Sequence, residues 1–118
     1  MKQQQQHPTD KRQAIIDNVA GVVAEHFSIS VEDVFRKSRK PIYVIPRNMT
    51  ILVLTVWHGF SQPDLAKRLG YKHSSSIHYA FKSITALIES DPVLLTTLKR
   101  VLTELKRQKK KRLKLTLQ

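Results

Sequence analysis

Residues 61–89 constrain the fold of this chain more than any other stretch. They contain two helical patterns separated by a short segment that begins at Gly70. Ser61 is a favourable capping residue for the first helix, and Asp64 suits the positive end of a helix. One of the serines at 74–76 is expected to cap the second helix. Two helices joined by so short a segment predict a helix-turn-helix.

The second of these helices is predicted to be amphipathic. Its apolar side chains recur at three- and four-residue steps and form one stripe, which consists of Ile77, Ala80, Phe81, Ile84, Leu87 and Ile88. The side chains off the stripe are small, hydroxylated or basic, and they include Ser75, Ser76, Tyr79 and Lys82. Such a face can approach base edges in a DNA groove. The alternative is a hairpin of an ordinary helical bundle, whose serines only cap and whose lysines only keep the surface soluble.

Two helices are predicted in the N-terminal third of the chain. The first begins at a cap formed by Thr9 or Asp10 and ends near His26, because apolar residues recur between them at helical steps. The second is short and runs from about Val31 to Arg36.

The third and the sixth helix complete the prediction. The third is expected to begin at Pro46, since proline fits the first position of a helix, and to end at Gly59. Its almost continuous apolar content marks it as the central buried helix. The sixth is capped by Asp91, and its helical apolar stripe gives way to a basic run beyond Leu105. The predicted fold class is therefore all-α, a six-helix bundle that contains a helix-turn-helix with a preceding basic loop.

Composition divides the chain into three parts. Residues 1–8 hold four consecutive glutamines and no apolar anchor, which predicts a disordered leader. Residues 9–105 carry all the helical patterns and are expected to form one domain. Residues 106–118 form a basic tail.

The charge of the chain favours an acidic partner. Twenty-one Lys and Arg residues stand against nine Asp and Glu residues, which gives a net charge of +12 and points to nucleic acid or an anionic membrane surface. A loop at 36–41 holds four basic residues, Arg36, Lys37, Arg39 and Lys40. These can neutralise backbone phosphates, and an arginine on a narrow loop suits a minor groove. A solvated charge run is the alternative.

Several function classes lack the residues they need. The sequence has no cysteine for a disulfide or a thiolate site, no GxxxxGK[ST] segment for a nucleotide, and no nucleophile elbow. Its five histidines form no close ligand pair for a metal. We therefore expect neither an enzyme nor a cofactor. No apolar run reaches the roughly 20 residues that span a bilayer, and no secretory signal is recognisable. A cytoplasmic, nucleoid-associated protein of a bacterium or phage is the expectation.

Two segments, RKSRKPIYVIPR and SQPDLAKRLGYKHSSSIHYA, resemble parts of a known family, the C-terminal DNA-binding domain (domain IV) of the bacterial replication initiator DnaA. The resemblance covers roughly residues 12–105 and aligns without gaps from Val34 to Ile84. It implies a fold of the DnaA domain IV or Trp-repressor-like type, in a small protein without the ATPase domain.

The resemblance also implies roles for individual residues. Arg39 matches an arginine that enters the minor groove, Lys37 and Arg47 match positions that face the DNA backbone, and Pro63 matches a proline at the edge of the major groove. The family's Asp-His-Thr-Thr is replaced here by residues 73–76. The serines keep a hydroxyl but lose the methyl group that packs on thymine, which implies a different DNA site or a weaker sequence preference. The predicted DNA-binding residues are Arg36, Lys37, Arg39, Lys40, Arg47, Pro63, Lys72, His73, Ser74, Ser75, Ser76, Tyr79 and Lys82.

Three functions remain open at this point. The first is binding of double-stranded DNA as a regulator of transcription or replication. The second is sequence-independent, nucleoid-type DNA binding, to which the basic run at 106–115 adds phosphate contacts unless it is only a solvating tail. The third is a module that binds a replication or transcription protein. A membrane-surface helix is disfavoured, because the leucines at 113, 115 and 117 alternate at period two.

Overall fold

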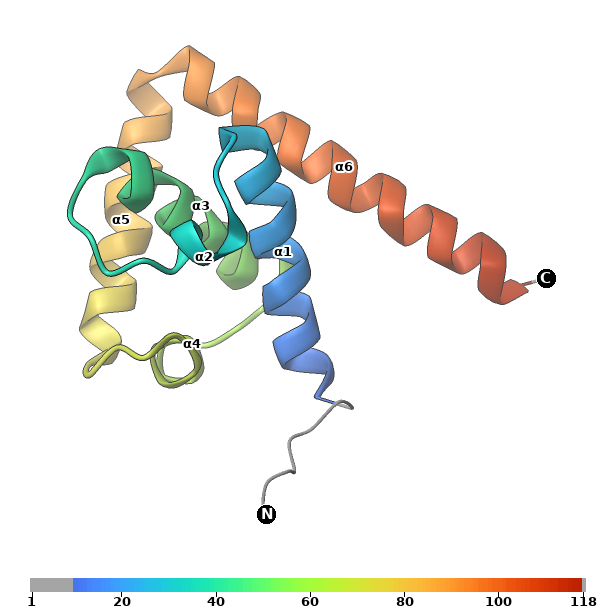
Figure 1. Ribbon diagram of the computed structural model, residues 1–118, viewed down its shortest axis with the longest axis horizontal. Coiled ribbons are helices and arrows are strands. Elements are labelled where there is room, and N and C mark those ends of the chain that lie inside the picture. The colour runs from blue at the N-terminus through green and yellow to red at the C-terminus, as the bar shows by residue number, and fades with distance from the viewer. Residues whose placement is uncertain (1–9, 118) are drawn as a thin grey trace.

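The computed structural model describes residues 10–117. This range contains six helices and no strand. The predicted leader at residues 1–8 lies outside the described residues. The helices are α1 (Lys11–Phe27), α2 (Val31–Val34), α3 (Pro41–His58), α4 (Gln62–Leu69), α5 (Ser74–Ser90) and α6 (Pro92–Leu117). Figure 1 shows α3 between α1 and α5, α4 at one end of α5, and the C-terminal part of α6 leading away from the other helices. The prediction of an all-α, six-helix fold is confirmed.

Helix α3 lies at the centre because its apolar residues cover most of its circumference. It packs against α1 on one side and α5 on the other, and α4 packs against α5. Large side chains that are fully or almost fully buried come from five helices and form one core: Ile16, Val19, Val23, Met49, Ile51, Leu54, Leu65, Ile77, Ile84 and Val101. Burying a side chain of this size contributes roughly 1.5–3 kcal/mol. This shared core holds α4 and α5 in a fixed relation to the rest of the bundle.

Polar side chains define where several helices begin. Asp10 caps α1 by accepting hydrogen bonds from the amides of Arg12 and Gln13. Asp91 does the same for the first turn of α6, at 3.0 and 3.2 Å. Both caps satisfy amides that have no partner inside the helix. The cap at Asp91 was predicted, and Asp10 was one of the two residues predicted to cap α1.

The predicted start of α3 at Pro46 is wrong. The helix begins at Pro41, and Lys40 before it is extended, with φ −69° and ψ 135°. Both prolines fit a first helical position by sequence alone. The helix extends to the earlier one because its added turn places Ile45 against the core. Pro46 is tolerated inside α3 although its ring nitrogen cannot donate to the carbonyl of Ile42.

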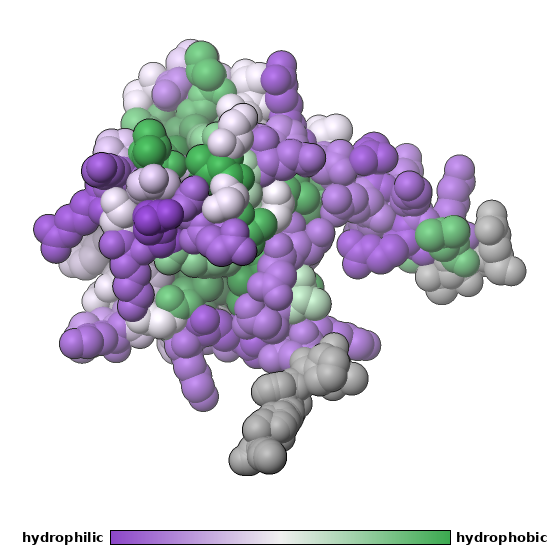
Figure 2. All heavy atoms as spheres, viewed as in Figure 1, coloured by the Kyte–Doolittle hydropathy of each residue, from purple (hydrophilic) through white to green (hydrophobic). Residues whose placement is uncertain are grey.

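One other boundary differs from the expectation. Helix α2 is shorter than predicted and leaves Val31 39% exposed, whereas Val34 is buried. Helix α6 continues through the basic run that follows Leu105 and ends at Leu117. Its second half projects as a hydrophilic rod with an apolar spot near the end, as Figure 2 shows. Among the described residues, no helix combines the length and the apolar content needed to cross a bilayer.

Candidate nucleic-acid interface

The turn between α4 and α5 is fixed at both ends by local interactions. At the start of α4, the Ser61 hydroxyl accepts a hydrogen bond from the Asp64 amide at 3.2 Å. At its end, Gly70 adopts a left-handed conformation with φ 80°, and the Tyr71 amide donates to the Ala66 carbonyl at 2.8 Å. Glycine reaches this region without a steric penalty. The predicted helix-turn-helix is therefore present as two packed helices.

The first turn of α5 differs from the prediction in its cap. His73, not a serine, occupies the capping position, and its side chain forms no capping hydrogen bond. His73 is the last extended residue, so the helix begins at Ser74 and not after it. A helix N-terminus that lacks a side-chain cap keeps amide donors for an outside acceptor, and its dipole favours an anion.

The outer face of α5 carries three of the predicted contact residues. Ser75, Tyr79 and Lys82 are spaced by four and three residues, so they share one face of the helix. All three are exposed, and Tyr79 is 68% exposed, whereas Ile77 and Ile84 lie buried on the opposite side. The division of α5 into a core stripe and a polar outer face follows the sequence prediction.

The basic loop before α3 is held in place by Arg47. Its guanidinium donates to the Arg36 carbonyl at 2.6 Å and to the Ser38 carbonyl at 3.4 Å. The Ser38 hydroxyl also accepts a hydrogen bond from the Lys40 amide, at 3.1 Å. The Nε of Arg47 is buried and has no acceptor within the described residues. Arg47 therefore fixes the loop to α3 through hydrogen bonds to its carbonyls, a role that the sequence did not suggest.

The other cations of the loop divide into paired and unpaired ones. Arg36 donates twice to Asp33, at 2.6 and 2.9 Å, and its guanidinium lies 5.0 Å from the centre of the Tyr43 ring. The hydrogen bond from Arg36 holds the pKa of Asp33 below its usual value. Lys37, Arg39 and Lys40 are exposed, and none of them forms an ion pair in the region that the structure covers. Their charges are available to a ligand.

The loop and the turn enclose one hollow of about 460 Å³. The predicted residues Lys37, Arg39, Arg47, Lys72, His73 and Ser76 line it. A Cβ atom placed on Gly70 would lie 3.9 Å from the Nζ of Lys37, so the side chain of Lys37 extends from the loop to the turn. Phe35, Ser38 and Tyr71 also line the hollow and were not predicted. The remaining predicted residues lie outside it: Arg36, Lys40, Pro63, Ser74, Ser75, Tyr79 and Lys82.

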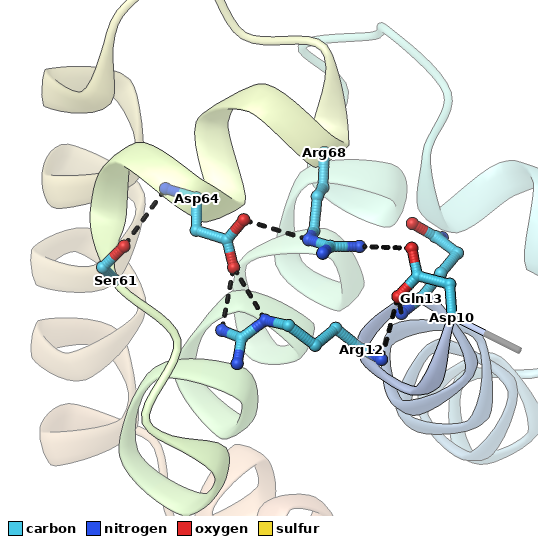
Figure 3. Close-up of polar contacts among 6 residues, drawn as sticks. All are labelled: Asp10, Arg12, Gln13, Ser61, Asp64 and Arg68. Carbon is cyan, nitrogen blue, oxygen red and sulfur yellow. Dashed lines mark hydrogen bonds and ion pairs between the residues drawn. The ribbon is translucent and has the colours of Figure 1, made fainter. Parts of the chain in front are cut away.

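Helix α4 is tied to α1 by a chain of four charged residues (Figure 3). Arg12 of α1 donates to one oxygen of Asp64 at 2.8 and 3.1 Å. Arg68 donates to the other oxygen of Asp64 at 3.0 Å and to Asp10 at 3.2 Å. The Arg12 guanidinium also lies 4.2 Å from the centre of the Phe60 ring. Sequence reasoning missed this network because its partners are 52 and 58 residues apart.

The network shifts the ionisation of its carboxylates. Partial desolvation opposes the charge of Asp64, but the hydrogen bonds from Arg12 and Arg68 outweigh it and lower its pKa. The amide of Gln13 and the Arg68 guanidinium lower the pKa of Asp10. Both carboxylates are therefore charged at neutral pH, and α4 is fixed against the start of α1 by charge-assisted hydrogen bonds.

A comparison with protein families matches residues 16–84 to the bacterial DnaA protein helix-turn-helix. The match includes the basic loop, α4 and the N-terminal part of α5. The chain belongs to this family. Chromosomal replication initiator proteins DnaA are similar to it over most of its length: the protein of Geobacter sulfurreducens is 32% identical over 70% of this chain, and that of Trichormus variabilis 29% over 89%. The protein of Xanthobacter autotrophicus is 27% identical over 74% of this chain. The aligned part makes up only 17–23% of these relatives.

Proposed function

We propose that this protein binds double-stranded DNA and acts in the control of replication or transcription. In this proposal the N-terminal part of α5 enters the major groove, and the loop at 36–40 places Arg39 in the adjacent minor groove. The supporting observation is the hollow that joins the loop to the turn before α5. Cations line it from both sides, with Lys37 and Arg39 on one and Lys72 on the other.

The charges of the proposed contact surface fit this role. Lys37, Arg39 and Lys40 have no ion-pair partner within the described residues, so binding phosphate breaks no existing pair. The start of α5 lacks a side-chain cap, which leaves amide donors for a backbone phosphate at the edge of the major groove. Membership of the DnaA helix-turn-helix family supports the same surface.

The residues proposed to read bases are Ser75 and Ser76, with Tyr79 beyond them. A serine hydroxyl donates and accepts, so it can pair with more than one base edge. The uniform hydroxyl run at 74–76 therefore favours a modest sequence preference over a strict one. Arg39 adds a preference for a narrow, A·T-rich minor groove.

Selection of bound duplexes from a random library, at two salt concentrations, tests the proposal. The selected duplex is then used with Arg39→Ala and with the double variant Ser75→Ala/Ser76→Ala. Arg39→Ala is expected to reduce the salt slope by about one and to relax the preference at flanking A·T pairs. The serine double variant is expected to relax the preference at the centre of the site and leave the slope unchanged.

Arg100→Ala is the matched control, since Arg100 is an exposed arginine of α6 outside the hollow. It should leave the base preference unchanged. If no duplex is enriched, or if Arg39→Ala and Arg100→Ala weaken binding equally, the two-groove mode is wrong. Stable binding of a replication or transcription protein without any duplex binding would instead favour an interaction module.

A further inference from the structure

A second cationic surface lies where the end of α3 meets α6. A groove of about 720 Å³ opens there, and it is lined by Trp57 and His58 of α3 and by Lys106, Lys109, Lys110 and Leu113 of α6. None of these residues belongs to the hollow beside the helix-turn-helix. Figure 1 shows α6 leading away from the turn between α4 and α5. The groove is thus a separate surface.

The walls of the groove carry uncompensated positive charge. No carboxylate of the described residues lines it. The three lysines form no ion pair in that part of the chain, whereas Arg107, the other cation of the lining, is held by Glu104 at 2.7 and 3.1 Å. Burial, together with the nearby charge of Lys109, lowers the pKa of His58, so the lysines and not this imidazole supply the positive charge of the groove at pH 7. The charge of the groove favours an anionic ligand.

The groove also offers an aromatic and apolar surface. Trp57 is 37% exposed, and its ring is perpendicular to the His58 ring, with 5.9 Å between the ring centroids. Leu113, on α6, is 53% exposed. An indole that is partly open to solvent among lysines combines a π-face with phosphate-binding charges. A ligand that only carried negative charge would make no use of the exposed Trp57 ring.

We propose that this groove binds single-stranded nucleic acid, with a base against Trp57 and backbone phosphates at Lys106, Lys109 and Lys110. A duplex fits less well, because its bases are stacked inside and only its phosphates reach a groove wall. An acidic peptide also fits less well, because carboxylates are best held by the fork of an arginine, and Arg107 is already engaged by Glu104. Lysine acts on phosphate as a point charge, with no demand on geometry.

Trp57 makes the site directly observable, since it is the only tryptophan of the chain. Titration of the full chain with an oligothymidylate of about 15 nucleotides is expected to quench its fluorescence. Binding of the same labelled oligonucleotide is then followed by anisotropy for Trp57→Leu and for the triple variant Lys106→Gln/Lys109→Gln/Lys110→Gln. Trp57→Leu is expected to weaken binding at least about fivefold, the loss of one base stack. The triple variant should also lower the salt slope by about 2.

The matched control is Lys99→Gln/Lys111→Gln/Lys114→Gln, which removes the same charge from exposed positions of α6 outside the groove. It should retain most of the affinity. Arg39→Ala should bind oligothymidylate normally, which separates this site from the duplex site proposed above. Equal losses in the two triple variants would reduce the effect to general attraction and overturn the proposal. The same holds if a duplex of equal length, or an oligoglutamate of equal charge, quenches Trp57 as strongly as oligothymidylate.

Discussion

Substituting Gly70 by alanine tests whether the turn between α4 and α5 sets the geometry of the interface. Gly70 has φ 80°, and a side chain there meets only the Nζ of Lys37, at 3.9 Å. The cost is therefore conformational and not a clash. Alanine in the left-handed region is less stable by roughly 1–2 kcal/mol, and its stiffer unfolded chain returns about 0.4–1 kcal/mol. We expect a net loss of about 1 kcal/mol, or about 3–6 °C in Tm.

Gly59→Ala provides the matched control. Gly59 ends α3 with φ 69°, and no atom lies within 4 Å of a Cβ placed there. It should lose stability to a similar degree, because the backbone strain is similar. Only Gly70 lies in the turn that leads into α5, so only Gly70→Ala is expected to weaken binding of the selected duplex. Thermal unfolding gives the stability change, and duplex titration below the transition gives the affinity.

Gly70→Asn separates strain from other causes. Asparagine enters the left-handed region more readily than alanine, so this variant should recover much of the lost stability and affinity. If Gly70→Asn is as unstable as Gly70→Ala, backbone strain is not the reason for the glycine. If Gly59→Ala weakens duplex binding as much as Gly70→Ala does, the turn has no special part in placing α5.

Three further outcomes follow from particular contacts. Arg47→Lys keeps the charge but loses the fork to the Arg36 and Ser38 carbonyls, so duplex affinity should fall with an unchanged salt slope. Because the pKa of Asp64 is lowered in the folded protein, its contribution to stability is present above its unfolded pKa, about 3.9, and is lost as the pH falls further. The unfolding midpoints of wild type and Asp64→Asn in denaturant should therefore converge in acid. Ile84→Ala empties a buried position and should cost about 2–5 kcal/mol by denaturant unfolding.

The sequence predicted the elements whose signals are local. Ser61 and Gly70 delimit α4 as expected, because a cap and a left-handed glycine act within one turn. The predicted start of α3 was wrong because two prolines, at 41 and 46, both fit the first position of a helix. Packing of Ile45 against the core decides between them, and packing depends on the assembled fold.

The candidate site divides in the same way. The residues offered to solvent were predictable from periodicity and charge, and the basic loop and the outer face of α5 are where the sequence placed them. The contacts that hold the basic loop in place were not predictable. Arg47 was predicted to face the DNA backbone, and that role stays a prediction; its guanidinium also binds loop carbonyls nine and eleven residues earlier in the chain. Contacts of this kind leave no periodic trace in the sequence.

Arg39 differs from four other arginines of the chain in a way that sharpens its proposed role. Arg12, Arg36 and Arg68 donate to carboxylates, and Arg47 donates to carbonyls. Arg39 is exposed and has no such partner within the described residues.

A planar fork of donors gains little over lysine unless an acceptor matches its geometry, so we expect that acceptor to lie on the ligand. Arg39→Lys should then keep the salt slope but lose preference for the selected duplex over a scrambled one. Lys40→Arg should leave both unchanged. Equal discrimination by wild type and Arg39→Lys would mean that Arg39 contributes charge alone.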